Sequence, residues 1–477
     1  MIRGSALRAS AGIAGAVVGI ATAALLLRHL GVAESGRYVT VISLLGIPVT
    51  VADVGLNVSA SRWLALSGPE DRDTLIANVL GQRLLLMPVA VLAAVAFAAI
   101  AAYPPAMVAG TAIAGAGFFF VALANALLLR LTVELRNGGL ALVDFLRQAI
   151  TFVGVAALVA LGASLAPFFV VQVLVGLCVV MLLPALIGRN AFVRPRWDRE
   201  EQRMLLRSAL PLAGALALGQ LYFRLVIILM SLISSAEQTG YFGGSLRAIE
   251  APIGISVLVA GVALPLLSAA ARDDRERLRY AIGGLGRGAI VAGVLVVLVT
   301  VRAAAPLMAL IGGEAFRPAG AVLRIQVGML LFNALYQIWT MALLALNRQR
   351  ELIGVNVLAL AGLALFAAVL VPPLGARGGA IASVLGDALL ACLIYWRVHT
   401  HLGWVMVPAG FLARVLVAAA FACVPLLVSG LPDFVAAALA GVVFLAVGQL
   451  IGMIPAELRA ELRLLIARRP GGATPTS

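Results

Sequence analysis

The sequence contains no lysine, and all 35 of its basic residues are arginine. A nucleotide-binding P-loop needs the lysine of its GK[ST] motif to reach the terminal phosphates. The chain therefore has no P-loop ATPase site, and any transport that it performs must draw its energy from another source.

Cysteine and histidine are almost as scarce, with three of each. The cysteines lie singly in apolar stretches, without the paired spacing of a metal site or a redox motif. The motifs GxSxG and HExxH are both absent. We expect no cofactor, no metal and no enzymatic activity. The residues concerned are Cys178, Cys392, Cys423, His29, His399 and His401.

Charged residues make up only 12% of the chain, whereas 63% is hydrophobic and the mean hydropathy is +1.09. A soluble fold of 477 residues cannot bury that much apolar surface, so the composition predicts a polytopic membrane protein. The net charge of +14 does not indicate nucleic-acid binding, because the arginines lie between apolar runs instead of forming one basic patch.

The apolar runs are long enough to cross a bilayer as helices, since about 20 residues rising 1.5 Å each match a hydrocarbon core of about 30 Å. We predict an all-α fold of about 14 transmembrane helices, the first of them a retained helix and not a signal peptide. The runs cover residues 9–28, 38–62, 76–102, 106–129, 142–162, 165–188, 209–233, 241–268, 284–311, 321–346, 352–371, 379–398, 409–429 and 434–454.

The connections between these runs alternate in charge. One set carries most of the arginines, as in residues 189–207, whereas the other set is nearly free of them, as in residues 234–240. Arginine-rich loops stay in the cytoplasm. The pattern therefore predicts that both termini are cytoplasmic.

The longest internal polar stretch, residues 189–207, separates two sets of six runs. Asp198 and Glu201 have the spacing of a capping box, which predicts that a short cytoplasmic helix begins there. The segments GRY at Gly36 and TGYF at Thr239 open the two halves and indicate an internal repeat. We predict lobes at residues 1–188 and 208–400, two additional helices in 401–456 and a basic cytoplasmic tail in 457–477.

Two charged residues lie deep inside apolar runs that a short turn joins. Arg224 and Glu250 each lie nine residues from the end of the run beside that turn. At that depth, about 13 Å along each helix, an unpaired arginine costs roughly 2.5 to 3.5 kcal/mol. In an antiparallel hairpin the two residues lie at the same depth, so we predict a polar site there, in which Glu250 holds the side chain of Arg224 and Gln220 lies one turn away. In the alternative, Arg224 reaches the headgroups and Glu250 pairs with Arg247.

Three further runs carry polar residues. Asp53 and Asn57 share a face of the second run. Asn333 and Gln337 share a face of the tenth, and Asp387 lies in the twelfth. Such side chains rarely face lipid; they join helices or line a cavity. In a two-repeat transporter the substrate path lies between the repeats near the midplane, so we expect these residues to meet there.

Several segments of the chain carry a recognisable pattern. They read LRHLGVAESGRYVTVISLLGIPVTVADVGLNVSASRWL, LYFRLVIILMSLISSAEQTGYFGGS, and LMALIGGEAFRPAGAVLRI followed by LLALNRQ. Together they resemble the polysaccharide-transporter branch (O-antigen and exopolysaccharide flippases) of the multidrug/oligosaccharidyl-lipid/polysaccharide exporter superfamily. The likeness covers residues 9–400.

The resemblance implies a flippase in the cytoplasmic membrane of a bacterium. It would translocate undecaprenyl-diphosphate-linked oligosaccharide by alternating access between two six-helix lobes. The implied partners are the polyprenyl-diphosphate-linked glycan, membrane lipid and other polysaccharide-assembly membrane proteins. Proton or sodium exchange on Asp53, Glu250 or Asp387, or the membrane potential, would drive the cycle. The family often has an acidic residue shortly after the arginine of the seventh helix, where this chain has Leu225 and Val226.

Three alternatives remain open. A cation-coupled multidrug exporter of the same fold favours an acidic, aromatic-lined N-terminal cavity, whereas aromatic residues are only 6% of this chain. A lipid II flippase also suits fourteen spans. A membrane glycosyl-polymerase generally needs a long extracytoplasmic loop, and no arginine-poor connection is long enough.

The topology is testable with single cysteines, Arg196→Cys and Gln238→Cys, in a variant without the native cysteines. We expect a membrane-impermeant thiol reagent to label position 238 but not position 196 in intact cells, because only the arginine-poor connection faces outside. Labelling at position 196 alone would reverse the assignment.

Overall fold

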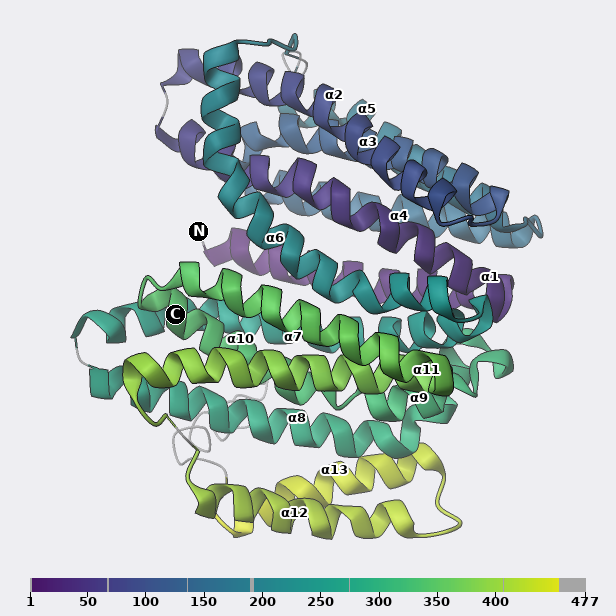
Figure 1. Ribbon diagram of the computed structural model, residues 1–477, viewed down its shortest axis with the longest axis vertical. Helices are drawn as coiled ribbons and strands as arrows, with labels where there is room; N and C mark the ends of the chain where they lie inside the picture. Colours follow the sequence, from purple (N-terminus) through teal and green to yellow (C-terminus); the bar gives the residue numbers. More distant parts are fainter. Residues whose placement is uncertain are drawn as a thin grey trace, which may run out of the picture.

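A computed structural model describes residues 2–66, 68–134, 136–188, 193–273, 275–405 and 407–453. These residues are almost entirely helical (Figure 1). In chain order the helices are α1 (Ile2–Leu66), α2 (Pro69–Ile100), α3 (Pro105–Val133), α4 (Asn137–Ala160), α5 (Leu165–Ile187), α6 (Arg199–Ile233), α7 (Ala236–Asp273), α8 (Arg275–Gly312), the short η1 (Glu314–Phe316), α9 (Ala319–Gln326), α10 (Met329–Ala345), α11 (Gln349–Leu402), α12 (Ala409–Leu427) and α13 (Asp433–Leu450).

Eleven of the described helices are long and apolar enough to cross a membrane. Two of them, α1 with 65 residues and α11 with 54, are far longer than one crossing requires. Each contains one glycine with a positive φ, Gly31 at 70° and Gly375 at 56°, a conformation that glycine adopts without steric cost. The chain is thus an all-α multi-pass membrane protein, and the count of fourteen spans stays a prediction.

The glycine in α11 allows the helix to fold back on itself. A Cβ added at Gly378 would overlap the carbonyl oxygen of Leu370, so the two arms touch just beyond the bend. At their far ends, Nε2 of His401 lies 2.8 Å from Oε1 of Glu351. The arms therefore pack antiparallel along their whole length.

The helices form two bundles and a smaller appendage (Figure 1). Helices α2 to α5 pack with α1, and α6 to α11 pack with one another. The first bundle meets the second mainly where α1 contacts α6 and α7. An internal repeat of two six-helix lobes would produce this arrangement, and the lobe boundaries at residues 188 and 208 remain predictions.

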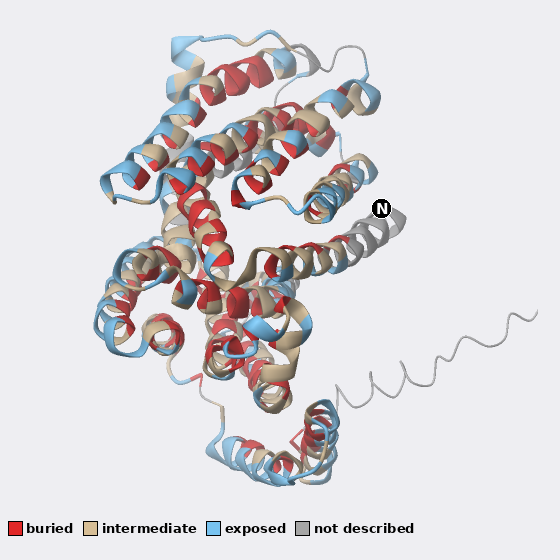
Figure 2. Ribbon diagram, turned by 90° about the vertical axis from the view of Figure 1, so that its right-hand side faces the viewer, coloured by how far each residue is buried: buried red, intermediate tan, exposed pale blue. Residues whose placement is uncertain are grey.

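The outer surface of the bundles is apolar, as a lipid environment allows. Leu85, Val89 and Leu92 follow one another along a face of α2, and each is 58% to 66% exposed. Exposed positions of this kind run along the outer helices, whereas buried positions concentrate at helix contacts (Figure 2). Inside, Gly117 and Gly176 let the backbones of α3 and α5 touch, which small residues commonly do in membrane helix packing.

Helix α6 begins where the sequence predicts. Asp198 is its N-cap, and Oδ1 accepts hydrogen bonds from the N–H groups of Glu200 at 2.9 Å and Glu201 at 3.1 Å. Asn78 of α2 completes the cap, because its Oδ1 accepts from the Asp198 N–H at 2.9 Å and its amide donates to Glu201. The predicted short helix is the first part of a longer one that continues to Ile233.

Two glycines bring the bundles into contact. A Cβ added at Gly36 of α1 would overlap the carbonyl oxygen of Ala236, and a Cβ added at Gly240 of α7 would overlap that of Val32. Gly36 and Gly240 belong to the GRY and TGYF segments that open the two halves. These two segments therefore pack directly on each other.

Side chains tie the bundles together at the same end. The Arg28 guanidinium donates to the carbonyl oxygens of Leu310 at 2.5 Å and Ile311 at 3.3 Å, at the end of α8. The Tyr103 hydroxyl, between α2 and α3, lies 2.6 Å from the Ser231 hydroxyl of α6. The bundles are thus joined at the end where the sequence predicts short, arginine-poor connections.

The appendage of α12 and α13 is held to α8 by an ion pair. Nε of Arg302 lies 2.7 Å from Oδ1 of Asp433, and Nη1 donates to the carbonyl oxygen of Leu426 at 3.1 Å. Arg302 of α8 therefore binds both the end of α12 and the start of α13.

We expect Gly240→Ala to open the contact between α1 and α7, because the added methyl group must displace backbone and overpacking of this kind costs about 1–3 kcal/mol. The measurement is labelling of Ser35→Cys, a buried position beside Gly36, by a membrane-impermeant thiol reagent in intact cells. An opened contact increases this labelling. Gly254→Ala, in the same helix with open space at its Cβ, is the matched control. Equal labelling in both backgrounds would show that the contact tolerates the methyl group.

Candidate functional site

Arg224 lies on α6 where that helix packs against α1. Its Nη1 donates to the Ser43 hydroxyl at 3.4 Å, and its Nε is buried without a hydrogen-bond partner among the described residues. Gly46, one turn after Ser43, leaves space beside it, since a Cβ there would lie 3.7 Å from the Nε. An arginine inside an apolar helix thus faces the contact between the bundles.

Glu250 is bonded to a neighbour on its own helix. Its Oε2 accepts a hydrogen bond from Nη1 of Arg247 at 2.8 Å, three residues earlier on α7. Among the described residues Arg224 forms no ion pair. Glu250 therefore pairs with Arg247 and not with Arg224, because a partner one turn away needs no alignment of a second helix. The three groups together carry one positive charge in excess.

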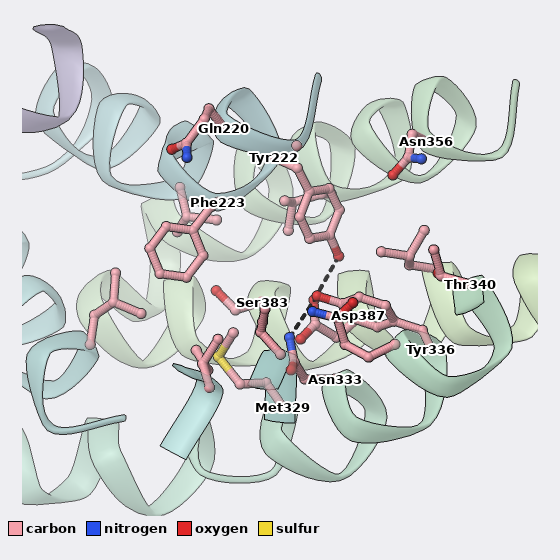
Figure 3. A pocket seen from close by; sticks show the side chains of 18 of the residues that line it. Gln220, Tyr222, Phe223, Met329, Asn333, Tyr336, Thr340, Asn356, Ser383 and Asp387 are labelled. Carbon is pink, nitrogen blue, oxygen red and sulfur yellow. Dashed lines mark hydrogen bonds between the residues drawn. The ribbon is translucent and has the colours of Figure 1, made fainter. Parts of the chain in front are cut away.

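A second group of polar residues lines a cavity of about 550 Å³ between α6, α7, α10 and α11 (Figure 3). Gln220, Asn333, Gln337 and Asp387 all contribute to its wall. The lining contains no residue of α1 to α5, within the part of the chain that the structure describes. These four residues lie together inside the second bundle, and their meeting with the polar residues of the first half stays a prediction.

Asp387 is the charged residue of this cavity, and it is only 1% exposed. Oδ1 accepts a hydrogen bond from the Tyr222 hydroxyl at 2.9 Å, whereas Oδ2 is buried without a partner among the described residues (Figure 3). Asn333 is similar, since its Nδ2 donates to the Tyr336 hydroxyl at 2.6 Å and its Oδ1 has no partner there. A buried polar atom left unsatisfied costs about 1–3 kcal/mol. Two such acceptors line one cavity.

Asp53 and Asn57 lie in α1, but their side chains fall outside the described residues. Their place in the substrate path stays a prediction. The described residues contain no group of three or more His, Cys, Asp or Glu side chains that could hold a metal ion. A cation at Asp387 would thus rely on one carboxylate and neutral oxygens.

Comparison with known proteins gives the family. Residues 1–271 match the sequence pattern of the family described as "Polysaccharide biosynthesis protein". The chain belongs to this family. The resemblance found in the sequence is confirmed at that level, whereas no curated protein matches the chain.

Solved structures show which fold this member of the polysaccharide biosynthesis protein family has. "Lipid II flippase MurJ, inward closed conformation" matches with a TM-score of 0.72 and 12% identity, over 93% of this chain and 98% of that one. An inward-facing multidrug resistance MATE family transporter of the MOP superfamily matches with a TM-score of 0.64 and 16% identity, over 81% and 94%. The eukaryotic MATE transporter AtDTX14 matches with 0.57 and 14%, over 83% and 96%. At these identities the likeness shows the fold alone.

In this family member the sequence pattern missed both tyrosines of the cavity. Tyr222 lies two residues from Gln220 and two from Arg224, a spacing that does not place side chains on one helix face. Tyr336 directly precedes Gln337 and lies three residues after Asn333, so the spacing of the polar residues in the tenth run could have identified it. Ser43 had no such signal, because only the packing of α1 on α6 brings it to Arg224.

Proposed function

We propose that this protein is a flippase that moves a polyprenyl-diphosphate-linked oligosaccharide across the cytoplasmic membrane by alternating access. Its family, and a fold shared with a lipid II flippase and multidrug transporters, support transport rather than enzymatic chemistry. The finer part of the proposal, a lipid diphosphate as substrate, depends on Arg224.

The excess positive charge between the bundles is the observation that carries this proposal. Glu250 neutralises Arg247, which leaves Arg224 with a hydroxyl partner and one buried nitrogen free. A guanidinium group can bind two phosphate oxygens at once and stays charged at any physiological pH. A diphosphate therefore satisfies it better than a neutral or cationic substrate, while the lipid tail stays in the bilayer.

Alternating access requires that the contact at Gly36 and Gly240 separate. Buried apolar side chains of both bundles form this contact, glycines make its closest approaches, and the ties beside it at Arg28 and Tyr103 are a few hydrogen bonds. Each such bond contributes only about 0.5–1.5 kcal/mol net. A contact of this kind is reversible, as a transport cycle needs.

Asp387 is the group that we assign to cation coupling. Its free Oδ2 can take up a proton, and Oδ2 with the free Oδ1 of Asn333 offers oxygen ligands for sodium inside the second bundle. Binding a cation there stabilises whichever conformation keeps these oxygens together, and release favours the other.

A cation-coupled multidrug exporter is the second candidate. The observation that favours it is the same cavity, which combines Asp387 with the rings of Tyr222, Phe223 and Tyr336 and has about 550 Å³. An organic cation would suit an acidic, aromatic-lined cavity of that size. In that case Arg224 variants would leave drug transport unchanged.

We expect Arg224→Lys to slow flipping about tenfold, because it keeps the charge but loses the planar fork that binds two phosphate oxygens. Arg224→Ala should be slower still. The measurement is flipping of a polyprenyl-diphosphate glycan by reconstituted protein, with expression and thermal stability recorded for each variant.

The matched control is Arg302→Lys. Arg302 also lies inside an apolar helix, and a lysine at this position can keep the ion pair with Asp433. It should transport at the wild-type rate. Full activity in Arg224→Ala would remove Arg224 from the substrate site and, with it, the support for a diphosphate.

We expect Asp387→Asn to abolish the response of transport to an imposed ion gradient, because the amide keeps the shape of the side chain and loses its charge. Flipping would be measured in proteoliposomes with either a proton or a sodium gradient. Thr340→Val, which changes an uncharged residue of the same cavity, should keep the response. An Asp387→Asn protein that responds like the wild type would place coupling elsewhere.

A further inference from the structure

A separate cavity of about 270 Å³ lies at the arginine-rich end of the first bundle. The ends of α1, α2, α3 and α5 line it, together with the connection between α3 and α4. It shares no residue with the 550 Å³ cavity or with the Arg224 site. Five of the residues in its wall are charged: Arg72, Asp73, Arg130, Glu134 and Arg136.

The charges in this wall do not balance. Asp73 forms an ion pair with Arg130, and Oε2 of Glu134 lies 3.8 Å from Nη1 of Arg136. Both carboxylates are thus occupied. Arg72 remains, half-buried, with its Nε buried and without a hydrogen-bond partner among the described residues. Among the described residues of this wall, one positive charge is therefore in excess, and it lies on Arg72.

The start of α4 adds to this positive potential. Arg136 is the N-cap residue of α4 and makes no side-chain cap, and the first turn contains no acidic residue. The first backbone N–H groups of a helix have no partner within it, and the helix dipole favours an anion there. Arginine side chains in a cavity wall, beside the start of a helix, are groups that bind phosphate.

The cavity also lies close to the level of the membrane surface. Leu64, in its wall, directly follows Trp63, which is 37% exposed near the end of α1. Tryptophan at a helix end is typical of the membrane interface, where lipid headgroups lie. Basic pockets between helices at this level suit lipid phosphates.

We propose that this cavity binds a phosphate group, carried either by an anionic membrane lipid or by a small soluble molecule. Arg72 supplies the charge that binds the phosphate, and the pairing of Asp73 with Arg130 reduces the repulsion between that carboxylate and the ligand. The site is independent of the translocation site, so its occupancy can be measured without transport.

The test compares purified wild-type protein with Arg72→Gln and with Arg203→Gln, an exposed arginine near the start of α6 that lies outside the cavity. The probes are phosphatidylglycerol, diacylglycerol, which lacks the phosphate, and inorganic phosphate alone. Retained lipid is counted by native mass spectrometry, and thermal stabilisation is recorded for each probe. We expect the wild type and Arg203→Gln to retain phosphatidylglycerol over diacylglycerol, and Arg72→Gln to lose about tenfold in affinity.

The probes also separate the two sources of phosphate. Stabilisation by phosphatidylglycerol alone identifies a lipid headgroup, whereas stabilisation by inorganic phosphate as well identifies a soluble ligand. Arg72→Lys, which keeps the charge, should bind more tightly than Arg72→Gln. Equal retention of phosphatidylglycerol and diacylglycerol by the wild type, with no effect of inorganic phosphate, would overturn the proposal, as would wild-type binding by Arg72→Gln.

Discussion

Lipid offers no hydrogen-bond partner, and the whole fold follows from that constraint. Each backbone N–H and C=O group inside the bilayer must be satisfied within its own helix or by another part of the protein. The chain accordingly changes direction inside α1 and α11 at Gly31 and Gly375, which have positive φ values, and its helices approach closely at glycine. A charged side chain, or a side-chain oxygen without a hydrogen-bond partner, is costly in this environment and therefore calls for a structural or functional explanation.

Three of the intramembrane arginines show the contrast. Arg302 has a carboxylate partner and a carbonyl partner at the appendage, and Arg247 has Glu250 one turn away. Arg224 has a single long bond to a hydroxyl, although burial makes an isolated charge costly. Two of these arginines thus have charged partners within the protein, whereas the third lies at the contact between the two bundles.

The other exceptional group, around Asp387, lies inside the second bundle. Helix α6 connects the two groups, because Tyr222 binds Asp387 on one side and Arg224 faces α1 on the other. A small rotation or tilt of α6 that follows the loss of the Tyr222–Asp387 bond would move Arg224 relative to Ser43. Rigid helices that shift between two packed arrangements are a common way to link distant sites. Coupling and substrate binding can therefore occupy different places and still act on one helix.

The sequence alone determined the class of the protein, because hydropathy and the distribution of arginine depend only on composition and order. It also located the start of α6 at Asp198, since a cap depends on residues within one turn. Spacing along a helix identified Gln220, Asn333, Gln337 and Asp387 as members of polar faces. Only the tertiary structure decided which helix covers each face. Periodicity gives the direction in which a side chain leaves its helix, but its neighbours depend on how separate helices pack. Packing therefore brought these four residues into one bundle and placed Arg224 beside Ser43.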